Sequence, residues 1–302
     1  MKIVVLGASG QIGSAIYNRL KDAHEVVGTS RSASERLLQF NPFSDDWSML
    51  GKPAVLINCV GQIEPSAQSS FYHVHVALTK RILENRKQLG DPRIIQISAL
   101  GSSANHHVEF LRTKGIADEL LLQHPNTAVI RPSIVCTHRT MVVRKMILLS
   151  NLGRVLLGVV PVPKGFLHTR IQPIMPEDLV SLVQKACLEN NVRMVDAVGP
   201  EEITFHEIIQ MLMKSRNQKL RVIEVPKMVT DTLVKNFLSV VLPKVIDAQQ
   251  YQLLFHHNTG NAAACEQLIG RSLQSTKEFF QQEFAHYAGN QISKSVKFLT
   301  TK

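Results

Sequence analysis

Lys114 lies in the stretch HHVEFLRTKGIADELLL, residues 106–122, whose pattern predicts a helix. A lysine ammonium one helical turn after a phenol would lower the phenol's pKa from about 10 toward neutrality and make it a general acid and base. Phe110 occupies that earlier position, and a phenyl ring has no exchangeable proton. The tyrosines all lie outside this predicted helix: Tyr17, Tyr72, Tyr251 and Tyr287. The spacing therefore indicates a lysine that lacks the phenol it would activate.

Two other side chains near Lys114 could supply a proton. His107 precedes it by seven residues, so on a helix the two would share a face, and a neutral imidazole could shuttle a proton near pH 7. Ser102 follows the predicted strand RIIQISAL and carries a hydroxyl. In the competing interpretation, His107 is an exposed residue at a helix start and Lys114 is a solvated helix lysine. We keep Ser102 and His107 as speculative catalytic candidates.

Three glycines follow the first apolar run, in VVLGASGQIGSAIYNRL. Gly7 permits a sharp exit from a strand, Gly10 leaves room for a pyrophosphate at backbone N–H groups, and Gly13 allows a helix to pack closely on a sheet. The helix start that follows would add partial positive charge. A purely structural turn is the alternative. The placement between a buried strand and a helix favours a dinucleotide phosphate loop.

The end of the second predicted strand indicates which dinucleotide fits. A site that prefers NAD usually has an acidic residue there, which accepts hydrogen bonds from the ribose hydroxyls. Here the sequence is GTSRSASER, with no acid before Glu35. Arg31, flanked by the hydroxyl residues Thr29, Ser30 and Ser32, suits a 2′-phosphate because its planar guanidinium pairs with phosphate oxygens. We therefore favour NADP(H) over NAD(H), with a solvated surface arginine as the alternative.

The elements that must position these residues alternate between strands and helices from the N-terminus, which predicts a parallel sheet covered on both faces. Predicted strands fall near 2–6, 24–30, 36–40, 54–60, 93–100 and 127–135, and predicted helices near 11–21, 67–90 and 106–122. Helical and strand patterns continue to about 242, including the capping box that begins at Thr204. The fold class is therefore α/β: a doubly wound parallel Rossmann sheet with a small α/β C-terminal lobe. We assign 1–150 to the Rossmann domain and 151–302 to the lobe, with segments returning to the sheet.

Composition restricts location and partners. The formal net charge of +10 comes from basic residues scattered in short clusters without aromatic interleaving, so we expect no nucleic acid partner. The four cysteines show no metal-like spacing, and we expect no metal site. Reduced thiols and the lack of a signal-like N-terminus predict a cytoplasmic protein. An amphipathic stretch at 227–246 leaves open a peripheral position at the inner membrane, on an anionic membrane surface.

The chain resembles an atypical short-chain dehydrogenase/reductase. GASGQIG is similar to the glycine motif of that superfamily, and VLINCVG, RIIQISALGSSAN, FLRTKGIADELL, AVIRPSIV and RIQPIMPEDLV follow in the order of one subgroup. That subgroup contains the dehydrogenase-like accessory subunit of respiratory complex I and free-standing bacterial relatives. The similarity covers residues 1 to about 200. The segment 249–280 also resembles the reductase half of bacterial proteins fused to a DoxX-like membrane domain.

The resemblance implies roles for individual positions. Lys114 would hold the hydroxyls of the nicotinamide ribose. The remaining implied cofactor-binding residues are Gly7, Ser9, Gly10, Gln11, Ile12 and Gly13 at the pyrophosphate, Thr29, Ser30, Arg31 and Ser32 at the adenosine phosphate, Cys59, Val60 and Gly61 beside adenine and ribose, and Ser98, Pro132 and Ser133 near the nicotinamide. Reductases of this superfamily use a tyrosine at the position of Phe110, so the resemblance implies dinucleotide binding without the usual general acid and base.

Our leading hypothesis is an NADP(H)-binding, dehydrogenase-like protein with weak or no turnover, whose cofactor is mainly structural or sensing. The alternative is an NADPH-dependent oxidoreductase, acting on a quinone, an enone or a carbonyl, or a sugar-nucleotide epimerase with a proton donor other than tyrosine. A third hypothesis is a redox-sensing interaction protein that binds a protein partner or a membrane surface.

Overall fold

The computed structural model describes residues 1–63, 69–137, 140–155, 158–217, 219–233 and 248–286. The predicted amphipathic stretch at 227–246 therefore lies mostly outside the described residues. The chain divides into two compact units. Unit 1 comprises Met1–Val135, Ile174–Gly199 and Gly260–Gln274, and unit 2 comprises Cys136–Pro173, Pro200–Thr259 and Ser275–Lys302.

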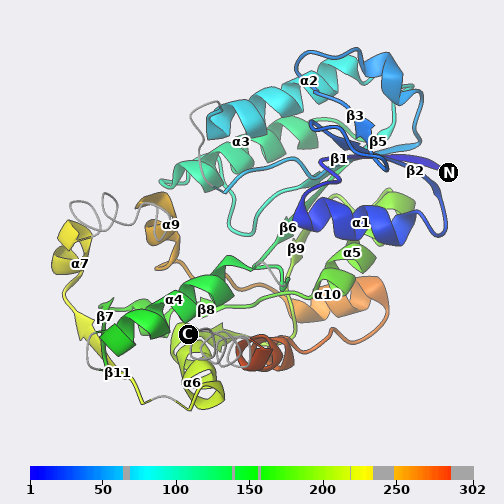
Figure 1. Ribbon diagram of the computed structural model, residues 1–302. Helices are drawn as coiled ribbons and strands as arrows, with labels where there is room; N and C mark the ends of the chain where they lie inside the picture. Colours follow the sequence, from blue (N-terminus) through cyan, green and yellow to red (C-terminus); the bar gives the residue numbers. More distant parts are fainter. Residues whose placement is uncertain (64–68, 138–139, 156–157, 218, 234–247, 287–302) are drawn as a thin grey trace, which may run out of the picture. The chain divides into compact units, whose positions relative to one another are not determined.

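Unit 1 is built on a seven-stranded parallel sheet in the order β3-β2-β1-β4-β5-β6-β9 (Figure 1). Its strands are β1 Lys2–Leu6, β2 Glu25–Ser30, β3 Leu38–Gln39, β4 Val55–Asn58, β5 Arg93–Ile97, β6 Thr127–Pro132 and β9 Met194–Ala197. This order confirms the predicted doubly wound Rossmann sheet. From β1 the chain adds β2 and β3 on one side and then β4, β5, β6 and β9 on the other. The strand order therefore switches between β1 and β4, and a crevice is expected outside the carboxyl ends of these two strands.

Helices cover both faces of this sheet, as Figure 1 shows. Helices α1 (Gln11–Leu20), α5 (Pro176–Leu188) and α10 (Ala262–Ile269) pack on one face, and α2 (Leu78–Asn85) and α3 (Glu109–Leu122) on the other. Side chains alternate along β1, so Ile3 and Val5 enter the first core and Val4 and Leu6 the second. Burial on both faces explains why the strands appear as continuous apolar runs in the sequence.

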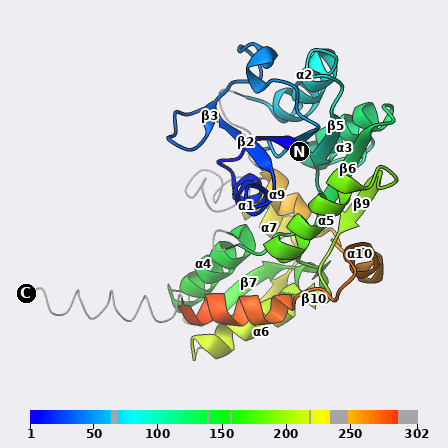
Figure 2. The ribbon, with the colours of Figure 1, turned by 90° about the vertical axis from the view of Figure 1, so that its right-hand side faces the viewer.

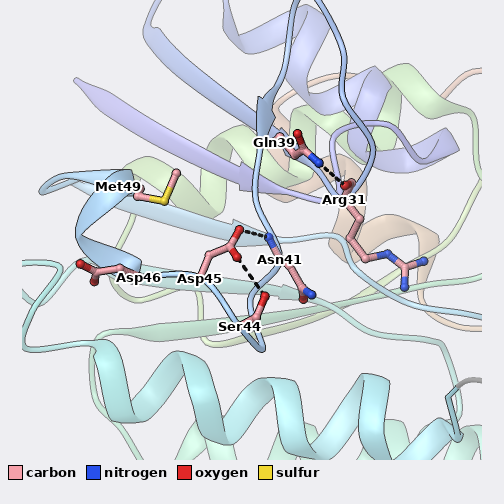
Figure 3. A pocket seen from close by; sticks show the side chains of 7 residues that line it. All are labelled: Arg31, Gln39, Asn41, Ser44, Asp45, Asp46 and Met49. Atoms are coloured by element: carbon pink, nitrogen blue, oxygen red, sulfur yellow. Dashed lines mark hydrogen bonds between the residues drawn. The ribbon is translucent and has the colours of Figure 1, made fainter.

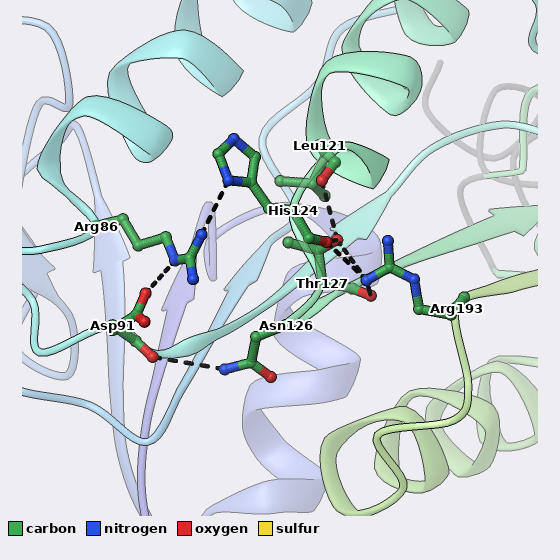
Figure 4. A network of polar contacts seen from close by, with 7 residues as sticks. All are labelled: Arg86, Asp91, Leu121, His124, Asn126, Thr127 and Arg193. Carbon is green, nitrogen blue, oxygen red and sulfur yellow. Dashed lines mark hydrogen bonds and ion pairs between the residues drawn. The ribbon is translucent and has the colours of Figure 1, made fainter.

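Arginines bind the free carbonyl groups at the ends of two helices in unit 1. Arg193 donates to Leu122 O at 2.6 Å, at the C-terminal end of α3. It also donates to His124 O at 2.7 Å (Figure 4). Arg93 does the same for α5, with its Nε 2.5 Å from Ala186 O. The last carbonyls of a helix lack intrahelical partners and attract cations. Part of the basic surplus of the chain is therefore structural.

Unit 2 is a small α/β assembly. Strand β7 (Val159–Pro163) pairs in parallel with β11 (Arg221–Val225), and β8 (Arg170–Ile171) pairs antiparallel with β10 (Ile203–Thr204). Its helices are α4 Met141–Val155, α6 Phe205–Ser215, α7 Lys227–Leu233 and α9 Ala248–Leu253, and α4 packs against α6 and β7 (Figure 2). The predicted capping box is confirmed: Thr204 and Glu207 exchange side-chain-to-backbone hydrogen bonds at the start of α6.

Two predicted helices differ from the observed ones. The stretch predicted as one helix at 67–90 contains a π-helical turn, His73–Ala77, before α2 begins. The helix predicted from residue 106 begins at Glu109, because Val108 before it is extended. Within the part of the chain that the structure describes, no helix has both the length and the apolar character to cross a bilayer.

Candidate functional site

The loop between β1 and α1 has a backbone that only glycine accommodates at two positions. Gly7 has a φ of +75°, and a Cβ at Gly13 would lie 2.2 Å from Gly7 O. The N–H of Gly10 donates to Gly7 O at 3.0 Å, which closes the turn. Gly10 is also the N-cap of α1 and provides no side-chain hydrogen bond to the first turn. Ser9, Gly10 and Gln11 are exposed at the rim of the loop, and Ile12 is half-buried behind it. The N-terminal end of α1, with its partial positive charge, is suited to an anion.

The end of β2 lies against the same loop, because Ala8 N donates to Thr29 O at 2.9 Å. Thr29 and Ser30 are buried, whereas Arg31 and Ser32 are exposed. Ser32 N donates to Ser30 Oγ at 3.2 Å, so the buried hydroxyl fixes the turn that presents the arginine. Of the four predicted adenosine-phosphate residues, the structure therefore leaves Arg31 and Ser32 accessible to a ligand.

An open hollow of about 760 Å³ lies beside Arg31 (Figure 3). It is lined by Arg31, Gln39, Asn41, Ser44, Asp45, Asp46 and Met49. Its carboxylates already have local partners: Asp45 accepts from Asn41 N and from Ser44 Oγ, and Asp46 caps the 3₁₀ turn at Trp47–Leu50. In Figure 3 the guanidinium of Arg31 points away from both aspartates. Arg31 thus presents its charge at the end of β2 without a carboxylate partner in this hollow.

The end of β4 passes beside the phosphate loop and the lysine. Val60 N donates to Asn58 Oδ1 at 3.1 Å, and the Asn58 amide donates to Gln96 Oε1 at 2.8 Å. Val60 also lies against Gly7, where a Cβ would come within 3.1 Å of Val60 N. Cys59 N donates to Leu6 O at 3.0 Å. A Cβ on Gly61 would lie 3.2 Å from Lys114 Nζ, so the glycine allows this segment to pass the lysine closely.

Lys114 is buried, with a side chain only 4% exposed. Its Nζ donates to Ile97 O at 2.9 Å, at the carboxyl end of β5. The helix approaches this strand end closely because Gly115 has no side chain: a Cβ there would lie 2.2 Å from the carbonyl carbon of Ser103. Burial lowers the pKa of Lys114 from 10.5 to about 8, against the opposing charge of Asp118. The structure therefore excludes the interpretation of Lys114 as a solvated surface lysine.

Asp118 is fully buried one turn after Lys114, and it occupies both serines that follow β5. Its Oδ2 accepts from Ser98 Oγ at 2.8 Å, from Ser102 Oγ at 2.7 Å and from Arg131 Nε at 3.0 Å. Burial raises the pKa of the Asp118 carboxyl, and the two serines, Arg131 and Lys114 act against that shift. Since both hydroxyl hydrogens point to the carboxylate, neither serine is oriented to donate to a ligand.

Phe110 packs in an aromatic cluster that sequence reasoning missed. Its ring lies edge-on to Phe71 and to His75, with centroid separations of 5.8 and 5.7 Å. His75 is 1% exposed and belongs to the π-helical turn His73–Ala77. The apolar neighbours in FYHVHVAL are typical of a helix face, and the local pattern carried no signal that this histidine packs on Phe110.

The other predicted positions fall in two environments. His107 is exposed, stacks on His106 at 4.6 Å, and lies before α3, so it does not share a helical face with Lys114. This overturns the geometric reason for treating it as a proton donor. Pro132 and Ser133 are buried at the end of β6, where Pro132 O accepts from Leu100 N and Ser133 N donates to Ala197 O.

Sequence comparisons find related proteins. The model of the NAD dependent epimerase/dehydratase family matches residues 3–111. The mitochondrial 40 kDa subunit of NADH-ubiquinone oxidoreductase from Neurospora crassa is 21% identical over 83% of this chain and 70% of its own length. The mitochondrial subunit 9 of the NADH dehydrogenase 1 alpha subcomplex from Arabidopsis thaliana is 22% identical over 74% of this chain and 60% of its own length.

Solved structures share the fold. A short-chain dehydrogenase/reductase superfamily protein from Agrobacterium tumefaciens with bound NAD superposes with a TM-score of 0.71 at 13% identity, covering 98% of this chain and all of that one. RMD from Pseudomonas aeruginosa complexed with NADPH has a TM-score of 0.63 at 15% identity, covering 94% of this chain and 99% of that one. At such identities the likeness concerns the fold.

Proposed function

We propose that this chain, which is an atypical short-chain dehydrogenase/reductase, binds NADP(H) and holds it with weak or no turnover, as a structural or sensing ligand. One observation carries the proposal: the chain combines a glycine loop and a buried lysine with a phenylalanine at the tyrosine position and with two serines whose hydroxyls are already bonded. Phe110 is packed in an aromatic cluster, and Ser98 and Ser102 both donate to Asp118. Such a site can hold a cofactor without an acid beside the reacting carbon.

The described residues fit a dinucleotide. A pyrophosphate would lie at the exposed start of α1, beside Ser9, Gly10 and Gln11, and a nicotinamide ribose would lie at Lys114. When bound, the cofactor supplies a hydride at its nicotinamide ring. Lys114 would orient the ribose through its ammonium group. With a pKa of about 8, that group is mainly charged at pH 7 and so remains a hydrogen-bond donor.

The preference for NADP(H) rests on Arg31. No acidic residue stands between Thr29 and Ser34 to accept from ribose hydroxyls, and Arg31 is exposed beside the hollow at the end of β2. The solved relatives include one complex with NAD and one with NADPH, so the fold is compatible with both dinucleotides. A guanidinium pairs with phosphate oxygens through two parallel bonds, which a 2′-hydroxyl cannot accept.

Calorimetric titration of the purified chain with NADPH and NADH tests both parts of the proposal. Arg31→Ala is expected to weaken NADPH binding by roughly 2 kcal/mol, since hydrogen bonds to charged groups contribute about that much, and to leave NADH binding unchanged. Arg36→Ala removes another exposed arginine of the same segment and is the matched control. The proposal fails if the wild-type chain binds neither dinucleotide, and the NADP preference fails if Arg31→Ala affects both equally.

One property of Lys114 favours a second function. That function is reduction of a carbonyl, a quinone or an enone, or else epimerisation of a sugar nucleotide. Its pKa of about 8 lies close to the operating pH, as is useful in a general acid. A substrate screen that follows NADPH absorbance tests this function. Loss of the rate in Lys114→Ala would support it, whereas a rate gained only in Phe110→Tyr would indicate a site that turns over only when the phenol is restored.

The location and the partner are proposals as well. We propose a cytoplasmic chain, with a peripheral position at an inner membrane as the alternative. We also propose a protein partner, because two relatives are named as subunits. Co-sedimentation with anionic liposomes across a salt series tests the membrane alternative. Binding that does not weaken with salt would contradict an electrostatic attachment.

A further inference from the structure

Gln39 lies at the end of β3, the edge strand of the unit 1 sheet, beside the end of β2. In the register of the two strands Ser30 pairs with Gln39, and Phe40 N donates to Ser30 O at 2.9 Å. Strand β2 ends at Ser30, so Arg31 is the first residue beyond it. The side chain of Gln39 reaches this residue, because its Nε2 donates to Arg31 O at 3.3 Å (Figure 3).

Side chains hold both polar groups of the peptide unit that follows Arg31. Gln39 donates to its carbonyl oxygen, and Ser30 Oγ accepts from its N–H, which is that of Ser32, at 3.2 Å. Ser30 is buried, so little water competes for its hydroxyl. A peptide unit is planar, and contacts at its oxygen and at its N–H together set its orientation. Gln39 and Ser30 therefore restrict the backbone rotation next to the Cα of Arg31.

A fixed backbone matters at Arg31 because its side chain is long and exposed. The residue borders the open hollow of about 760 Å³, and its guanidinium points away from Asp45 and Asp46 (Figure 3). An arginine loses rotamer freedom when it binds, and its planar fork pairs with phosphate oxygens only in a restricted geometry. A peptide unit that is held before the ligand arrives leaves fewer unproductive directions for the guanidinium and so lowers the cost of binding.

We propose that Gln39 is a positioning residue for dinucleotide specificity, which together with Ser30 directs the Arg31 guanidinium toward the 2′-phosphate of NADP(H). This inference rests on the proposed NADP(H) binding and names a residue other than Arg31 on which the selectivity depends. Gln39 acts through the backbone of Arg31 and not on the ligand. Its contribution is therefore expected only with a ligand that carries the 2′-phosphate, and only in a chain that retains Arg31.

Calorimetric titration with NADPH and NADH compares the wild type with Gln39→Leu, Arg31→Ala and the variant that carries both changes. Leucine has a side chain of similar size and no donor for Arg31 O. We expect Gln39→Leu to bind NADPH about fivefold more weakly than the wild type, since the net contribution of one neutral hydrogen bond corresponds to about that factor, and to bind NADH equally well. In the Arg31→Ala background the same substitution is expected to change the NADPH affinity by less than about twofold, because no guanidinium remains to be directed.

Ser30→Ala tests the other contact of the same peptide unit. It removes the acceptor of Ser32 N and leaves the hydrogen bond from Gln39 to Arg31 O in place. We expect weaker NADPH binding, by a factor similar to that of Gln39→Leu, and unchanged NADH binding. An unchanged ratio of the NADPH and NADH affinities in Ser30→Ala would overturn the role of the peptide unit.

Gln88→Leu is the matched control. Gln88 is also exposed, and its Nε2 also donates to a residue that lines the hollow, Asp46, whose Oδ1 lies 2.9 Å away. The control makes the same chemical change without touching the peptide unit after Arg31, and it is expected to leave both affinities unchanged. A loss of NADPH affinity equal to that of Gln39→Leu would show a general effect on the hollow and would overturn the inference. Thermal unfolding of each variant checks that the fold is retained.

The remaining outcomes separate this inference from the proposed function. If the wild-type chain binds neither dinucleotide, or if Arg31→Ala does not weaken NADPH binding, the NADP(H) proposal and this inference fail together. If Arg31→Ala weakens NADPH binding and Gln39→Leu does not, the inference is overturned while the proposed function stands. Equal weakening of both dinucleotides in Gln39→Leu would show a packing role of β3 and would overturn it as well. A full loss that persists in the Arg31→Ala background would show that Gln39 acts independently of Arg31, which also contradicts a positioning role.

Discussion

Lys114→Met tests whether the lysine is charged inside the protein. The ammonium of Lys114 is 4% exposed and bonded to Ile97 O, and methionine has a similar length and no charge. Removing the charge changes how the free energy of unfolding depends on pH, which can be measured in buffer without dinucleotide.

The size and sign follow from the pKa of Lys114, which burial lowers from 10.5 to about 8. Between these two values the unfolded chain binds more protons than the folded one, so the wild type gains stability as the pH rises through this window. The shift of about 2.5 units corresponds to about 3 kcal/mol, at 1.36 kcal/mol for each unit. Below pH 8 the full cost of burying the charge is present, and above 10.5 it is absent. The methionine variant has no such slope.

Urea denaturation of both proteins between pH 7 and pH 10.5 measures the difference. The stability of the wild type minus that of Lys114→Met is expected to rise by about 3 kcal/mol across this range, because all other titrations contribute equally to both. Lys80→Met, which removes an exposed lysine from α2, controls for the loss of a lysine as such. A difference that does not change with pH would refute the burial of a charged Lys114.

Three further changes test other parts of unit 1. Gly13→Ala is expected to lower the free energy of unfolding by about 3 kcal/mol and to abolish NADPH binding, because its Cβ would lie 2.2 Å from Gly7 O. The control Gly10→Ala, whose Cβ would lie 3.3 Å from the same oxygen, is expected to stay folded, and equal thermal stability of the two variants would contradict this. Asp118→Asn leaves Arg131 without its buried carboxylate and is expected to lower stability by about 3 kcal/mol in urea denaturation, so an unchanged midpoint would rule out the ion pair as a contributor. Arg193→Met removes the hydrogen bonds to the carbonyls at the end of α3 and is expected to speed amide hydrogen exchange in the last turn of that helix. Exchange that speeds up equally along the whole chain would argue against local capping.

Local sequence patterns were sufficient for the sheet and the phosphate loop. The apolar runs predicted the strands because a parallel sheet is buried on both faces, and Gly7 and Gly13 predicted the loop because their backbone excludes a side chain. The absence of a phenol at Phe110 was equally visible. These features depend on residues that are neighbours along the chain, so their physical cause is contained in a short segment.

The tertiary structure decided the state of the side chains around Lys114. Asp118 occupies Ser98 and Ser102, which precede it by 20 and 16 residues, and His75 meets Thr113 across 38 residues. Such contacts depend on how α3 and the π-helical turn pack on the carboxyl end of β5. Burial then sets the chemistry, because it lowers the pKa of Lys114 and raises that of Asp118. The sequence alone determined that this site has a lysine and no phenol. Only the folded structure decided that the serines donate to a carboxylate and that a buried histidine packs on Phe110, since desolvation and hydrogen-bond partners exist only once distant segments are packed together.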